Sequence, residues 1–261
     1  MASQYYSTLT EQLYIAYLGR PADIRGLRPF SEKLAAAVHT TQAPDLGRIA
    51  QAYMGTPALV DLLSDMANSA ESVALYGANT PLDTYVNSIF LELFNRPVKA
   101  AGLAYWTGQI SEGKISRAAA PLEIMAGAYA NTTDVAQAAI DRAVINNKTS
   151  VALHFTASID TIDEFVGYSG TAAARTAHDM LHTVTATTDV AAFQAAIDAV
   201  IEKIEVAGYG SINNPRGNYM QQTDHLASAD SEVAPTSFPL VDHSHVTLVG
   251  VPGFNPAALG A

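Results

Sequence analysis

The sequence predicts a mainly α-helical protein, with two tandem duplicated helical units and an extended or β arm at its C-terminus. Apolar residues recur at helical spacing through most of the first 206 residues. Two similar segments lie 76 residues apart, and the composition changes at Gly208. We therefore expect a first repeat unit at residues 1–79, a second at 80–157, a helical extension at 158–207 and the arm at 208–261.

The two similar segments match at five positions with one constant offset, either with the same residue type or with another aromatic. The matched pairs are Arg20 and Arg96, Pro21 and Pro97, Gly26 and Gly102, Leu27 and Leu103, and Phe30 and Trp106. An offset that holds over whole helices indicates a duplicated supersecondary unit.

Each segment is expected to form a corner between two helices. The arginine lies in the last turn of one helix, where its charge stabilises the negative helix end. The proline cannot continue that helix. The glycine suits a tight backbone position before the next helix, whose leucine and aromatic residue turn back onto the first. This interpretation gives these residues a structural role and no catalytic one.

The second segment also carries a resemblance. It reads Leu93-Phe94-Asn95-Arg96-Pro97, followed by Ala101-Gly102-Leu103-Ala104-Tyr105-Trp106. This pattern resembles the helical repeat domain of unknown function found in bacterial surface-layer and type I-secreted proteins, and phycobilisome linker domains are distantly similar. The first segment is diverged, with Arg28-Pro29-Phe30 in place of the Tyr-Trp ending. The resemblance spans residues 5–157, more loosely to 206, and implies an extracellular scaffold without catalytic residues.

Helix start signals divide the two units further. Thr56-Pro57 places proline at a first helical position and predicts a helix over 58–67. Residues 68–79 read as a short connector, and Thr80-Pro81 then restarts the pattern. We expect the following helices at 82–94, 101–112 and 116–129.

A long helix is expected after Thr132 and Thr133. Its predicted apolar face consists of Ile140, Val144, Val151 and Phe155. Beyond a short acidic segment, two more helices are expected at 172–184 and 189–206, the second with an apolar seam that includes Ile197 and Ile204.

From Gly208 onward, Gly, Pro, Asn and Ser interrupt every helical pattern, and only residues 240–251 read as a strand. Such an arm could pair its strand with a neighbouring copy. The segment Val246-Thr247-Leu248-Val249-Gly250-Val251 resembles the uncleaved C-termini of type I-secreted surface proteins.

Composition excludes several classes of function. The net charge is −11 and no run of Lys or Arg occurs, so we expect no nucleic-acid partner. There is no cysteine, which excludes disulfides and thiolate metal sites. No apolar run is long enough for a membrane span, and the first residues do not resemble a secretory signal peptide. Charged residues make up only 15%, a low share that favours burial of surface against further copies of the chain.

Three groups of residues have the chemistry of metal ligands. His178 and His182 share a helix face in a pattern that imitates the zinc metalloprotease motif, with Asp179 in place of its glutamate. A catalytic zinc needs a third protein ligand, and the sequence offers no well-placed candidate. Surface histidines are the alternative interpretation.

The other two groups are acidic or lie on a predicted strand. Asp160, Asp163 and Glu164 offer oxygens for Ca²⁺, but without the spacing of a dedicated calcium loop. His243 and His245 lie on one side of the predicted strand and could hold a metal at a subunit contact. A solvated strand face is the alternative for this histidine pair.

The sequence thus predicts a non-enzymatic structural protein that is extracellular, lies at the cell surface and assembles with copies of itself into a surface layer, lattice or filament. Its only expected cofactor is Ca²⁺. A first alternative is a module that anchors to cell-surface polysaccharide through aromatic residues such as Tyr5, Tyr6, Tyr14, Tyr105 and Trp106. A second alternative is a zinc hydrolase at His178 and His182.

Overall fold

The computed structural model describes residues 2–38 and 45–213, and the helices in this part of the chain confirm the mainly α-helical prediction. The chain divides into two units, Met1–Pro215 and Arg216–Ala261, of which the first contains all the described residues. The predicted strand at 240–251, with His243 and His245, lies outside the described residues.

The helices of the described residues are listed here with their bounds: α1 (Ala2–Leu18), α2 (Ile24–Val38), α3 (Leu46–Tyr53), α4 (Pro57–Ala67), α5 (Ala70–Tyr76), α6 (Leu82–Phe94), α7 (Ala100–Ser111), α8 (Ala120–Ala130), α9 (Val135–Ser158), α10 (Ile162–Gly167), α11 (Thr171–His182) and α12 (Gln194–Asn213). None of them is long and apolar enough to cross a membrane.

Helix α1 lies at the centre of the first unit. It contacts helices α2, α4, α5, α6, α8 and α9. Leu13, Ala16 and Tyr17 are completely buried, because a helix that is apolar on most of its circumference can only be accommodated inside a core. Each such large side chain contributes about 1.5–3 kcal/mol through burial. The core therefore forms around the helix that leads into the first Arg-Pro corner.

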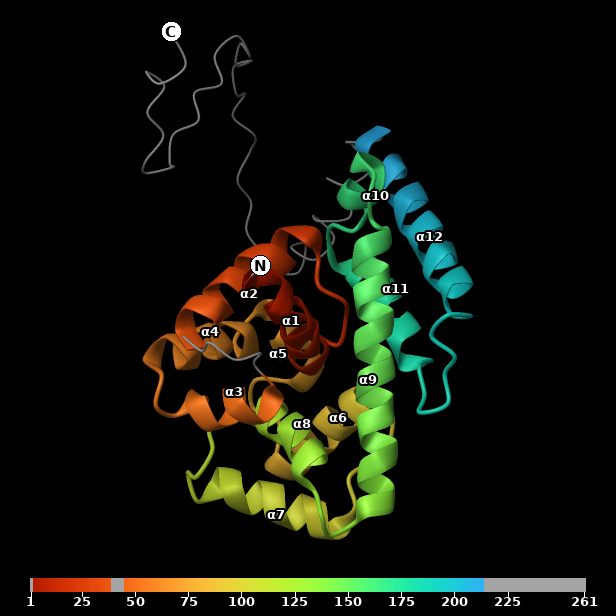
Figure 1. The fold of residues 1–261 in the computed structure, drawn as a ribbon. Helices are drawn as coiled ribbons and strands as arrows, with labels where there is room; N and C mark the ends of the chain where they lie inside the picture. Colours follow the sequence, from red (N-terminus) through yellow and green to blue (C-terminus); the bar gives the residue numbers. More distant parts are fainter. Residues whose placement is uncertain (1, 39–44, 214–261) are drawn as a thin grey trace, which may run out of the picture. The chain divides into compact units, whose positions relative to one another are not determined.

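Helix α9 is the other long organising element. Figure 1 shows it standing between the helices α1–α8 and the helices α10–α12, and it contacts members of both groups. Val144, Val151 and Phe155 are buried as expected. Ile140 is 50% exposed, so the prediction that it belongs to the core face is wrong. It lies in the second turn of α9.

Local start signals explain several helix boundaries. Pro57 is at the first position of α4, and Asp134 begins α9 by accepting a hydrogen bond from the Gln137 N–H. Thr161 and Glu164 form a capping box at α10. Between α4 and α6, where only a connector was expected, Ser69 caps the short helix α5.

The described end of the chain differs from its prediction. Helix α12 continues to Asn213, although the expected arm begins at Gly208. Its buried seam is Ile197, Ile201 and Ile204. A glycine inside a helix costs only about 1 kcal/mol relative to alanine, so Gly208 alone does not end the helix. The arm itself lies outside the described residues, and the tandem duplication and the internal boundaries of the first unit stay predictions.

Candidate functional site

Both corner arginines lie just beyond their helices, which end at Leu18 and Phe94, so the prediction that they belong to the last helical turn is wrong. The first Arg-Pro corner joins the end of α1 to α5. Arg20 donates from Nη2 to Glu71 Oε2 at 2.9 Å, while its Nε donates to Glu71 Oε1. Nη1 donates to the Pro21 carbonyl at 3.0 Å. The guanidinium carbon also lies 5.5 Å from the ring centroid of Tyr14. A bidentate pair of this kind holds both partners in one geometry.

The second corner has the same local chemistry at the end of α6. Arg96 donates from Nε to Asp141 Oδ1 at 2.8 Å and from Nη1 to the Pro97 carbonyl at 3.0 Å. Its guanidinium carbon lies 5.2 Å from the ring centroid of Phe90. Asp141 also accepts from Gln137 Nε2 at 3.0 Å. Because Arg96 follows α6 and Asp141 lies in α9, this ion pair connects the two helices.

The glycines of the two corners are not equivalent. Both lie inside the following helix, Gly26 in α2 and Gly102 in α7, and not before it as predicted. A Cβ at Gly26 would lie 1.9 Å from Tyr14 Oη, so a larger residue would displace the Tyr14 ring. A Cβ at Gly102 would meet only Val98 Cγ2 at 3.3 Å. The aromatic residues also differ, because Phe30 packs edge-on against Tyr14. Trp106 instead lies against Gly127 of α8, where a Cβ would be 2.9 Å from Trp106 Cζ2.

Each corner borders a cleft. The first cleft, of about 640 Å³, is lined by Arg20, Glu71 and Phe165 among others. The second, of about 510 Å³, lies between α6, α7, α8 and the start of α9. Its lining combines aromatic side chains with charged and amide groups: Phe90, Phe94, Arg96, Tyr105, Trp106, Asn131, Asp134, Gln137 and Asp141.

The second cleft is the candidate site for a ligand or a protein partner. Trp106 is partly buried, whereas Tyr105 is 56% exposed, with the two ring centroids 4.9 Å apart at 78°. Of the other tyrosines expected to stack on sugars, Tyr6 and Tyr14 are buried in the core, and the side chain of Tyr5 lies outside the described residues.

The structure also brings together His178, His182 and a residue that the sequence did not indicate. Glu92 of α6 places Oε2 3.1 Å from His178 Nε2 and 2.7 Å from His182 Nε2. Burial opposes the charge of Glu92, yet the hydrogen bonds from the two imidazoles lower its pKa to about 2. The same contact with Glu92 raises the pKa of His178. Within the described residues, this trio is the group of three potential metal ligands that lie close together.

One of the predicted calcium ligands, Glu164, takes part in a helix cap. Glu164 Oε2 accepts from the N–H groups of Asp160 and Thr161 at 2.9 and 3.0 Å. These bonds begin α10 and fix the glutamate as a helix cap. Asp160 and Asp163 are not brought together with Glu164 into a close ligand cluster within the described residues. The calcium site stays a prediction, as does the metal site at His243 and His245.

Comparison with known proteins gives one match. The family model "Domain of unknown function (DUF4214)" matches residues 63–129, which run from α4 to α8 and include the second corner and Trp106. The expected helical domain of unknown function is therefore found over the second corner, whereas the first corner lies outside the match. No curated protein and no solved structure matches the chain. What is shown is thus a segment of the chain that is similar to a domain family whose description names no function.

Proposed function

We propose that this protein is a non-enzymatic, extracellular structural subunit that assembles with copies of itself into a surface layer, lattice or filament. The observation that carries the proposal is helix α7. Its sequence is rich in Ala, Leu, Tyr, Trp and Ile, yet none of its residues is buried. Its Leu103, Trp106 and Ile110 pack against the core but are only partly buried, so the helix keeps exposed apolar area. Exposed apolar area of this kind is typical of an interface.

Further exposed hydrophobic residues lie on α8 and α9, which border the second cleft together with α7. Tyr105 on α7, Tyr129 on α8, and Val135 and Ile140 on α9 are 56%, 38%, 61% and 50% exposed. They belong to the helices that border the second cleft, and we call these four residues the α7 surface. Figure 1 shows α7 beside α8, with one end of α7 next to the start of α9. Tyrosine and isoleucine on such a surface would bury apolar area against another copy.

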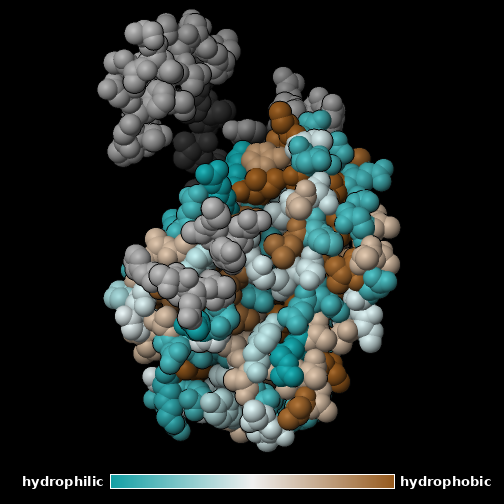
Figure 2. All heavy atoms as spheres, viewed as in Figure 1, coloured by the Kyte–Doolittle hydropathy of each residue, from teal (hydrophilic) through white to brown (hydrophobic). Residues whose placement is uncertain are grey.

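A separate apolar region lies at α10. Figure 2 shows hydrophobic and hydrophilic side chains interspersed over the visible face, with a gathering of hydrophobic ones near α10. Ile162 at the start of α10 is 79% exposed. Two separate apolar regions on one subunit suit heterologous contacts, which repeat without closing and so build an extended array. The resemblance of the corner motif to surface-layer and type I-secreted proteins supports the extracellular location.

The test is a pair of matched variants of the full chain. Tyr105→Ser combined with Ile140→Ser removes apolar area from the α7 surface without touching a buried residue. We expect it to abolish or strongly weaken assembly in sedimentation velocity, with and without Ca²⁺. The control Met54→Ser changes a side chain that is 70% exposed and outside this surface, and should assemble like the parent protein. Equal assembly of all three proteins would contradict the proposed interface.

The polysaccharide-binding alternative is favoured by the lining of the second cleft. Exposed Tyr105 and partly buried Trp106 lie beside Asn131, Asp134 and Gln137. Aromatic faces next to amides and carboxylates provide both stacking and hydrogen bonds for a sugar. Glycan binding by a monomeric protein, lost in Trp106→Ala, would favour this alternative. Polymerisation without any glycan would favour the structural subunit.

A further inference from the structure

Glu92, His178 and His182 form a small polar cluster between α6, α11 and the end of α1. The exposed fractions of their side chains are 12%, 23% and 32%. Both imidazoles come from one face of α11, with ring centroids 4.3 Å apart. A Cβ at Gly19 would lie 2.7 Å from His178 Cδ2 and 3.1 Å from Glu92 Oε2. Glycine at the end of α1, with φ of 68°, is what leaves room for the cluster.

Hydrogen bonds from Lys148 and Asn95 hold the backbone around the cluster. Lys148, buried in α9, donates from Nζ to the Glu92 carbonyl at 2.5 Å and to Asn95 Oδ1 at 2.7 Å. Asn95 in turn donates from Nδ2 to the carbonyls of His182 and Val184 at 3.1 and 2.7 Å. These hydrogen bonds hold α6 and the end of α11 at a set separation. Positioned side chains of this kind favour binding because little ordering remains to be done.

One imidazole also has an outer partner. His178 Nδ1 lies 3.1 Å from Asp179 Oδ1. With Nδ1–H donating to that carboxylate, Nε2–H donates to Glu92 in the metal-free chain, and loss of the Nε2 proton would free its lone pair for a metal ion. Histidine ligands of metal ions are usually oriented in this way, with the other ring nitrogen bound to a carboxylate, carbonyl or water.

We propose that Glu92 Oε2 and Nε2 of His178 and His182 bind one divalent transition-metal ion of the Zn²⁺ class. Two imidazoles and one carboxylate suit Zn²⁺ and similar ions, whereas Ca²⁺ takes oxygen ligands. Zinc bonds of about 2.0–2.1 Å in tetrahedral geometry place neighbouring ligand atoms about 3.3 Å apart. The observed 3.1 Å fits this spacing, and the 2.7 Å contact needs only a small rotation of a side chain.

The ion would replace the hydrogen bonds that now join the imidazoles to the carboxylate. It would connect α6 to α11. In the metal-free chain the two helices are connected by the Asn95 hydrogen bonds and by the contacts of the imidazoles with Glu92. The partial exposure of both histidines leaves the fourth position accessible to water. The site is independent of the proposed assembly, because none of its residues belongs to the α7 surface.

The experiment uses the full chain, stripped of metal with a chelator and titrated with Zn²⁺ alone in a calorimeter. We expect one equivalent of Zn²⁺ per chain and a rise in Tm on binding. Glu92→Gln and His178→Asn should each weaken binding at least 10-fold. Asp179→Asn should weaken it less than either ligand variant. Co²⁺ loaded in place of Zn²⁺ should give the intense visible absorption of a four-coordinate site.

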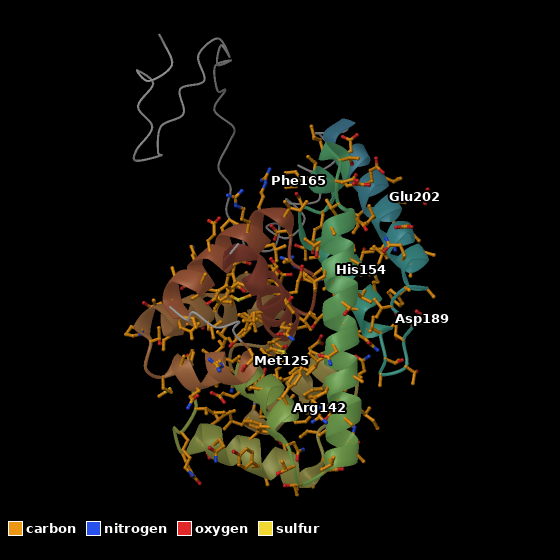
Figure 3. The ribbon with its side chains drawn as sticks, in the orientation of Figure 1. Met125, Arg142, His154, Phe165, Asp189 and Glu202 are labelled. Carbon is orange, nitrogen blue, oxygen red and sulfur yellow. The ribbon has the colours of Figure 1, made fainter. Side chains whose placement is uncertain are left out.

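Matched controls separate this site from other histidines. His154 lies on α9 and is exposed, as Figure 3 shows, so His154→Asn should bind Zn²⁺ like the parent protein. His243→Asn with His245→Asn tests the pair outside the described residues and should also leave binding intact. Far-UV circular dichroism checks that each variant is folded. If a histidine variant unfolds, Glu92→Gln is the test of ligand loss, because glutamine keeps the size and hydrogen-bonding capacity of glutamate. No binding by the folded parent chain, or binding unchanged in folded Glu92→Gln, would overturn the proposal.

Discussion

Glu11 is a buried carboxyl group in the central helix, and its surroundings suit its protonated form. Its side chain accepts from the Ala22 N–H at 2.8 Å and lies 2.6 Å from Thr156 Oγ1. Thr156 Oγ1 also lies 3.0 Å from the Ala22 carbonyl, so a protonated Glu11 can donate to Thr156 while Thr156 donates to Ala22. Burial raises the pKa of Glu11 to about 7, although the hydrogen bonds that the ionised carboxylate accepts from Thr156 and Ala22, and the charge of Arg20, oppose the shift.

Glu11 therefore makes stability fall as pH rises. Between its ordinary pKa of 4.5 and its folded pKa of about 7, the folded chain holds a proton that the unfolded chain has lost. The free energy of unfolding should decrease across this window by up to about 1.4 kcal/mol per pH unit from this group. Glu11→Gln reproduces the protonated hydrogen-bond pattern and should flatten the dependence in urea unfolding from pH 5 to 8. A variant with the parent slope would contradict this assignment.

Breaking the partly buried Arg96–Asp141 ion pair should destabilise the protein more than breaking an exposed ion pair. The side chains are 21% and 7% exposed, and the geometry is bidentate. Asp141→Ala leaves a partly buried guanidinium without its carboxylate and should cost about 3–5 kcal/mol in chemical unfolding. Glu32→Ala breaks the exposed Arg28–Glu32 pair and should cost about 0.5 kcal/mol or less. Equal effects would show that the corner is not held by this ion pair.

The side-chain partners of the corner arginines and of His178 could not be predicted from the sequence. The arginines and prolines of both corners were identified from their spacing, but their carboxylate partners were not. Glu71 and Asp141 lie 51 and 45 residues along the chain from their arginines. Glu92 is 86 residues from His178. No local pattern connects residues across such distances, because helix packing alone brings them together.

At the scale of the element, the packing of α7 on α8 depends on one glycine. A Cβ at Gly127 would lie 2.9 Å from Trp106 Cζ2, whereas a Cβ at Gly108 of α7 would meet nothing within 4 Å. Gly127→Ala should destabilise the protein by about 1–3 kcal/mol through overpacking. Gly108→Ala should stabilise it by up to about 1 kcal/mol, since alanine is the better helix former. Thermal unfolding of the two variants measures both; equal shifts in the same direction would refute the Trp106–Gly127 contact.

Helix starts were predictable because their signals are local. Thr56-Pro57 begins α4 as predicted. For the long helix α9 the predicted caps Thr132 and Thr133 are wrong, because Asp134 is the residue that caps it. The short helix α5 was expected only as a connector, because seven residues carry too little periodicity. Ile140 was placed on the core face of α9 because its spacing fits, but the described residues leave it 50% exposed. Periodicity identifies an apolar position and does not tell whether the covering surface belongs to the same chain.

At the scale of the whole molecule, the mainly helical fold follows from the sequence and the assembly remains a proposal. The described residues form a core around α1 and leave the apolar helix α7 without a buried residue. The division into duplicated units stays a prediction, because residues of both predicted units belong to one core. The role of residues 208–261 also stays a prediction, because most of this arm lies outside the described residues. The account rests on the claim that another copy covers the α7 surface.

Sedimentation velocity of the purified full chain over a concentration series tests that claim most directly, with negative-stain microscopy of the same samples. The account predicts growing species and ordered arrays or filaments at high concentration, which Tyr105→Ser with Ile140→Ser removes. A single monomeric species at every concentration, with Ca²⁺ present and absent, would contradict it.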